Sequence, residues 1–179
     1  MARTAMIWQD LLLDRWVDEA ELRAAAATAF LAPISAVTVT DDAEQLAATT
    51  PSARVILERV RQYRDFPLQI LVAICDDELV QRLDGFDGVL RVARELAGHL
   101  HTTVLFAEGP LTPSEWVRVR PTGDVDVVSL DVDETRDVDS FFVVAQRELP
   151  VTQQSERSKR TRLTARSPSS LDDSVPADV

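Results

Sequence analysis

An acidic segment over residues 121–140 contains the side chains best suited to chemistry. It carries seven carboxylates against one base, Arg136. Carboxylates at such close spacing can bind a hard cation such as Mg²⁺ or Ca²⁺, or they can present a negative surface to a positively charged partner. Valines lie among the acids over residues 125–132, so we expect a strand with one apolar and one acidic face that runs into an acidic loop.

The sequence Asp131-Val132-Asp133-Glu134-Thr135 follows an apolar run over residues 127–130 and resembles the first motif of the haloacid dehalogenase superfamily. The resemblance implies that Asp131 is a nucleophile towards phosphate, that Asp133 is an acid and base, and that Mg²⁺ neutralises the charges. In that family the motif lies on the first strand of a doubly wound sheet. Here it comes late in the chain, and the only lysine is Lys159. A metal-dependent phosphotransfer or hydrolase site at Asp131 and Asp133 is therefore an alternative function.

The same carboxylates also fit the alternate spacing of a calcium-binding loop, with Asp131, Asp133 and Asp137 as candidate ligands. The sixth position is Arg136, where such a loop needs glycine, and the twelfth is Phe142, where it needs glutamate. We therefore expect no metal and no cofactor. We expect the acids to lie on an exposed strand edge, where like charges discourage sheet-to-sheet aggregation.

The remaining candidates for catalysis are Cys75, His99 and His101. A cysteine beside an imidazole can act as a nucleophile, but Cys75 ends an apolar run, where a cysteine usually packs as a small hydrophobe. Two imidazoles and one thiolate are too few for a closed zinc site. We therefore expect no catalytic residues and no enzymatic activity.

The elements that position these residues follow from hydrophobic periodicity. A short amphipathic helix is expected over residues 7–17, and a second helix follows Asp18 as its N-cap and ends before Pro33. Further helical segments are expected over residues 76–83 and 89–100. The expected strands span residues 34–40, 53–63, 68–75, 102–106, 116–120 and 125–132, with the 53–63 segment ambiguous between strand and helix. Residues 141–145 are expected to form a last strand or a docked apolar segment.

This pattern predicts an α+β fold in two layers, with helices packed on a largely antiparallel sheet and the order α-β-β-β-α-β-β-β. Residues 1–150 are expected to form one domain. Residues 151–179 are rich in Ser, Thr, Gln, Arg and Pro without periodicity, so they are expected to be a disordered polar tail.

Charge narrows the classes of partner. Residues 1–150 carry 14 basic and 26 acidic residues, whereas residues 151–179 carry five basic and four acidic. An acidic body repels phosphate backbones and anionic lipids, so we expect neither nucleic acid nor a membrane as partner. The single cysteine excludes an internal disulfide and fits a reducing, cytoplasmic compartment.

We therefore expect a non-catalytic acidic module that binds a basic protein, comparable in size and charge with immunity proteins, antitoxin-like inhibitors and small secretion chaperones. The expected binding residues are Asp124, Asp126, Asp131, Asp133 and Trp116. Trp8 and Trp16 are expected in the core, or as interface anchors if they are partly exposed. A homodimer formed by pairing of sheet edges is a further possibility.

Overall fold

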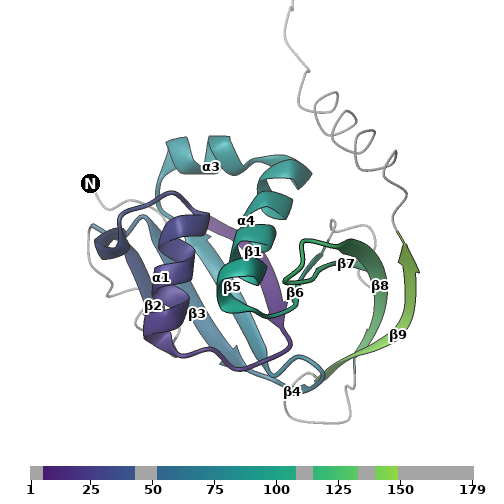
Figure 1. Cartoon of the computed structure of the whole chain (residues 1–179). Coiled ribbons are helices and arrows are strands. Elements are labelled where there is room, and N and C mark those ends of the chain that lie inside the picture. The colour runs from purple at the N-terminus through teal and green to yellow at the C-terminus, as the bar shows by residue number, and fades with distance from the viewer. Residues whose placement is uncertain (1–5, 43–51, 108–114, 133–139, 149–179) are drawn as a thin grey trace, which may run out of the picture.

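The computed structural model describes residues 6–42, 52–107, 115–132 and 140–148. These residues form helices on a single sheet (Figure 1), which confirms the α+β class. The helices are α1 (Glu19–Ala29), α3 (Asp77–Leu83) and α4 (Gly85–Leu100), with a short 3₁₀ turn, η1 (Ile34–Ala36). The strands are β1 (Met6–Leu13), β2 (Val37–Thr40), β3 (Val55–Arg61), β4 (Tyr63–Arg64), β5 (Leu68–Ile74), β6 (Val104–Ala107), β7 (Glu115–Val119), β8 (Val125–Val132) and β9 (Ser140–Glu148). The expected tail over residues 151–179 lies outside the described residues.

The strands follow the order β2-β3-β5-β1-β6-β7-β8-β9-β4 across the sheet. Among the described residues, six neighbouring pairs are antiparallel and two, β2 with β3 and β4 with β9, are parallel. Only Gln62 separates β3 from β4, yet these two strands lie near opposite ends of the order. The sheet therefore curls round, as Figure 1 shows for β7, β8 and β9.

The first element corrects the expected order. Residues 7–17 were expected to form a helix, but residues 6–13 form β1, which lies between β5 and β6 in the middle of the sheet. Leu11, Leu12 and Leu13 are all fully buried, because both faces of this strand are covered. Such a strand shows no apolar–polar alternation, so its leucine run imitated the spacing of an amphipathic helix.

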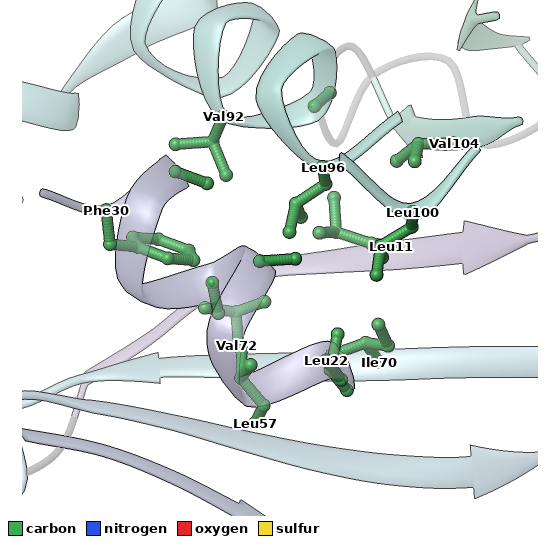
Figure 2. Packing of buried hydrophobic residues seen from close by; sticks show 14 of the residues in the cluster. Leu11, Leu22, Phe30, Leu57, Ile70, Val72, Val92, Leu96, Leu100 and Val104 are labelled. Carbon is green, nitrogen blue, oxygen red and sulfur yellow. The ribbon is translucent and has the colours of Figure 1, made fainter. Parts of the chain in front are cut away.

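Helices α1 and α4 pack on one face of the sheet and enclose the main core (Figure 2). Leu22 of α1 and Phe30, the residue that caps the end of this helix, meet Val92, Leu96 and other residues of α4 over buried strand residues. The ring of Trp8 contacts that of Phe30 edge to face, with 5.6 Å between centroids, so Trp8 belongs to the core.

The expected N-cap of α1 is confirmed. The Oδ1 atom of Asp18 accepts a hydrogen bond of 2.9 Å from the backbone N–H of Glu21, one of the donors that the first helical turn leaves without a partner. Asp76 caps α3 in the same way, with 3.0 Å between its Oδ1 atom and the backbone nitrogen of Leu79. These two carboxylates are therefore structural.

The opposite face of the sheet carries a smaller apolar cluster. Its buried members come from β1, β6, β7, β8 and the turn before β5; they are Leu12, Phe66, Leu105, Trp116, Val128 and Leu130. Because successive side chains of a strand point to opposite faces, Leu12 lies on this face while Leu11 and Leu13 belong to the helix-covered core. This second face also carries polar side chains, which include Arg118 and Asp126 of the β7–β8 hairpin.

Candidate functional site

The hairpin that was expected to bind a partner forms as predicted. Strands β7 and β8 pair with Trp116 opposite Val128 and Arg118 opposite Asp126. Asp124 lies exposed in the connecting turn, where its side chain accepts a hydrogen bond of 2.8 Å from the hydroxyl of Thr122. Gly123 has a φ of 88°, a conformation that favours glycine, so the turn places Asp124 at the tip.

The expectation that the hairpin carboxylates point into water is wrong for Asp126. This residue is 6% exposed and lies between the guanidinium groups of Arg118 and Arg120. Arg118 donates two hydrogen bonds to it, of 2.8 and 2.6 Å, and Arg120 donates one of 2.9 Å. Asp126 is therefore neutralised within the chain.

The environment of Asp126 sets its protonation state. Burial raises the pKa of Asp126, but hydrogen bonds and positive charge from Arg118, followed by those from Arg120, outweigh burial and hold this pKa below its usual value. Trp116 is also buried, within the apolar cluster of the same face. Of the hairpin residues expected to bind a partner, Asp126 and Trp116 are therefore buried within the fold, while Asp124 is exposed to solvent.

The alternative metal site cannot be placed on side chains. Asp131 lies in β8, where its backbone pairs with Phe142, while its side chain and residues Asp133 and Asp137 fall outside the described part of the chain. Within the described ranges, no group of three or more His, Cys, Asp or Glu residues is arranged to hold a metal ion. A site on Asp131 and Asp133 stays a prediction, tested by calorimetric Mg²⁺ uptake that Asp131→Asn should abolish.

A different surface combines an aromatic ring with exposed acids. Trp16 lies between β1 and α1, packs in part against the main core and is partly exposed. The guanidinium carbons of Arg59 and Arg61 lie 5.2 and 4.4 Å from its ring centroid. Arg59 also donates hydrogen bonds of 2.6 and 2.8 Å to Asp41 and one of 3.0 Å to the carbonyl of Val17.

We call this region the Trp16 surface. It comprises the residues between β1 and α1, the end of β2 and the end of β3, namely Trp16, Asp18, Asp41, Asp42, Arg59 and Arg61. All of them are at least partly exposed. Two arginines lie over its ring, and Asp41 binds one of them, so the surface is pre-organised and carries carboxylates.

The loop that carries Trp16 is tied to the far end of α4. The Oδ1 atom of Asp14 accepts hydrogen bonds of 2.5 Å from the Thr102 hydroxyl and 3.0 Å from the Thr103 backbone. Arg15 donates to the carbonyl of Leu100 at 3.1 Å from Nε, and it forms an ion pair with Glu21. A guanidinium at a helix C-terminus interacts favourably with the helix dipole, so these contacts fix the loop on both sides of Trp16.

A buried carboxylate lies next to Arg59 in the chain, on the opposite face of the sheet. Glu58 of β3 is 8% exposed and pairs in register with Thr40 of β2 and Leu71 of β5. Burial, and then the negative charge of Asp42, raise the pKa of Glu58. On β1, burial also raises the pKa of Asp10, whose register partner is again Leu71. Glu58 and Asp10 therefore flank the same residue at positions two strands apart.

Sequence reasoning missed the role of Arg118 and Arg120, although a signal was present. In a hairpin whose turn spans residues 120–124, alternation places Arg118 opposite Asp126 on the same face. The Trp16 surface left no comparable signal, because its residues come from segments at least 17 positions apart in the chain and meet only after β2 and β3 pair.

Comparisons with protein-family models, with curated proteins and with solved structures found no match for this chain. In the part of the chain that the structure describes, no helix is both long and apolar enough to cross a lipid bilayer.

Proposed function

We propose that the protein is a non-catalytic cytoplasmic module that binds a basic partner protein, and that it does so through the Trp16 surface. The observation that carries this proposal is the state of Trp16, which is partly exposed and held between Arg59 and Arg61. Tryptophan and arginine are the residue types most enriched at the energetic centres of protein interfaces. An ordered ring also loses little conformational entropy when it is buried by a partner.

The exposed carboxylates of the Trp16 surface favour a positively charged partner. Asp18, Asp41 and Asp42 are exposed, and the described body belongs to a segment with 26 acidic and 14 basic residues. Asp41 shares its charge with Arg59, whereas the Asp18 carboxylate accepts a hydrogen bond from a neutral backbone N–H and keeps its full charge. A positive protein surface would be steered towards these carboxylates, and the association would weaken as salt screens their charge.

The experiment is a pull-down from the native host with the full chain as bait, at low and high salt. Three baits are compared: the native protein, Trp16→Ala combined with Asp42→Asn, and a control with Asp77→Asn and Glu78→Gln on α3. The control removes two exposed carboxylates, one more than the Trp16 variant, at positions far from Trp16 in the chain. We expect a basic protein that the native and control baits recover at low salt and that the Trp16 variant loses.

Circular dichroism and thermal melting establish that each bait is folded before it is used. Equal recovery of the partner by the native bait and by the Trp16 variant would move the interface elsewhere. Recovery of no basic protein by the native bait at either salt concentration would refute the proposed function.

A further inference from the structure

Strand β2 lies at one end of the strand order, so one of its edges has no neighbouring strand among the described residues. Backbone N–H and C=O groups along such an edge can pair with an extended segment of another chain. Natural edge strands are commonly protected by charged side chains, by proline or by a bulge. β2 runs from Val37 to Thr40 as alternating valine and threonine, and its ladder with β3 is regular. This short edge therefore lacks all three of these protective features.

The exposed large apolar side chains of the described ranges lie just before this edge. They are Leu31, which is 62% exposed, and Ile34, which is 55% exposed. Ile34 begins the turn η1, which leads directly into β2. Two apolar side chains that a partner can bury are thus found at the start of an open sheet edge.

Leu31 also has an unfavourable backbone conformation. Its φ is 53°, in the left-handed region that favours glycine. The turn after α1 fixes this conformation, because the N–H of Leu31 donates to the carbonyl of Thr28 at 3.1 Å. The next N–H, of Ala32, donates to the carbonyl of Ala27 at 3.0 Å. A leucine here gains neither full burial nor a relaxed backbone, so its side chain is best explained by a contact with another molecule.

We propose that the partner adds an extended segment to the open edge of β2 and places a large apolar side chain against Leu31 and Ile34. This inference rests on the proposed function, because it describes how the basic partner binds. The edge is continuous with the Trp16 surface, since Asp41 follows β2 directly and bonds to Arg59, which lies over the Trp16 ring. A segment that pairs with β2 therefore leads its next residues to the Trp16 surface, where basic side chains meet carboxylates.

A second copy of this chain fits the edge less well than a segment of a basic protein. Residues 1–150 carry 26 acidic and 14 basic residues, so two copies repel each other. β2 contributes only four residues to a ladder. A stable dimer buries about 1,200–2,000 Å² of surface in total, which needs a much larger contact. A basic segment avoids the repulsion and adds contacts at both ends of the edge.

The test is an NMR titration of the full, ¹⁵N-labelled chain with a short acetylated and amidated peptide, arginine-threonine-valine-threonine-valine-leucine. The reversed sequence is titrated as well, so that both strand directions are sampled. The matched control ligands carry the same side chains but have N-methylated backbones, which cannot donate the hydrogen bonds of a ladder. We expect saturable shifts of the amide signals of residues 38–40 with one of the two peptides and none with its N-methylated form.

Variants at one position separate the apolar contact from the stability of the fold. Leu31→Gly removes the side chain and relaxes the backbone, so it should keep or raise the melting temperature. It should weaken peptide binding by about five- to tenfold, as expected when a partly buried leucine contact is lost. Leu31→Met keeps an apolar side chain and should bind as the native chain does. Ile34→Ser should weaken binding by a similar factor to Leu31→Gly.

Three results of the titration would overturn the inference: no saturable shift in β2, equal shifts with the N-methylated peptides, or native affinity in both Leu31→Gly and Ile34→Ser. Light scattering gives a fourth. A native chain that is a dimer, and that Ile34→Ser converts to a monomer, would assign the edge to a second copy instead.

The pull-down separates this failure from that of the proposed function. If Leu31→Gly bait recovers the partner as well as native bait while the Trp16 variant does not, the function stands and strand addition is wrong. If native bait recovers no partner, the function fails, whereas the peptide titration still reports whether β2 accepts a strand.

Discussion

Arg118 of β7 and Asp126 of β8 form a two-pronged ion pair across the hairpin, with hydrogen bonds of 2.8 and 2.6 Å. Both side chains are largely buried, at 15% and 8% exposure. Asp126→Asn removes the negative charge that both of these hydrogen bonds reach from a largely buried guanidinium, so it should lower the free energy of unfolding by about 2–3 kcal/mol. Urea denaturation measures this loss. Asp124→Asn, in the exposed turn, should change stability by about 0.5 kcal/mol or less.

The same pair predicts an acid-dependent loss of stability. The arginines hold the pKa of Asp126 below its usual value of 3.8, so the folded state binds this proton less readily than the unfolded state does. The stabilisation is therefore complete above about pH 4 and is lost as the pH falls through the folded-state pKa. The difference between native protein and Asp126→Asn should shrink over that range in urea denaturation curves; an unchanged difference down to pH 2 would contradict the ion pair.

Two glycines of α4 provide a matched pair. A Cβ atom at Gly88 would lie 2.2 Å from the backbone oxygen of Leu83, whereas one at Gly98 would meet nothing within 4 Å. Gly88→Ala should thus destabilise the protein by about 2–3 kcal/mol, because the junction between α3 and α4 must move. Gly98→Ala should stabilise it by roughly 0.5–1 kcal/mol through helix propensity. Thermal melting compares the two, and a stable Gly88→Ala variant would show that the helices are not packed this closely.

Glu58→Gln should make the protein more stable at neutral pH. Burial and Asp42 raise the folded-state pKa of Glu58 above its usual value of 4.5, so the folded state binds this proton more readily than the unfolded state does. The native protein therefore loses stability as the pH rises from about 4.5 through the folded-state pKa, and the uncharged variant does not. We expect a gain of roughly 1–2 kcal/mol at pH 7 that vanishes below pH 4.5. Glu95→Gln, on the exposed face of α4, is the control and should show no such gain.

Arg15 should hold the C-terminus of α4 in place. Its Nε atom lies 3.1 Å from the carbonyl oxygen of Leu100, and its guanidinium also pairs with Glu21. Arg15→Ala should cost about 1–2 kcal/mol and should accelerate amide hydrogen exchange in the last turn of α4. Arg23→Ala breaks only a surface pair with Glu19 and should cost a few tenths of a kcal/mol. Unchanged exchange near Leu100 in the Arg15 variant would contradict the anchoring role.

Local patterns predicted most elements because those elements obey local rules. The alternation of Val37 to Thr40, the hairpin signal around Gly123 and the Asp18 cap all reflect interactions within a few residues, and each is present in the structure. The ambiguous segment over residues 53–63 is a strand, as favoured. Residues 6–13 were mistaken for a helix because the residues that cover the two faces of this strand, such as Leu96 and Trp116, come from distant parts of the chain.

The candidate site was less predictable than the fold. Charge density drew attention to residues 121–140, but density alone does not reveal which acids have arginine partners. Asp126 has two such partners, whereas Glu58 has no arginine partner in the part of the chain that the structure describes, because Arg59 and Arg61 project to the other face. Trp16 becomes a surface feature only once β3 places both arginines over its ring.

Strands β3 and β4 are almost consecutive in the chain but pair with different partners, which affects the order in which the sheet forms during synthesis. Tyr63 and Arg64 pair with Ser140 and Phe141, nearly 80 positions later, while β3 pairs with β5 after a short turn. A ribosome-bound nascent chain could thus assemble β3 with β5 early, but the seam between β4 and β9 must wait until about residue 141 has left the exit tunnel. Because this loop is long and closes late, the pairing of β4 with β9 should be slow. Until these strands pair, their unpaired edges are open to chaperones and to aggregation.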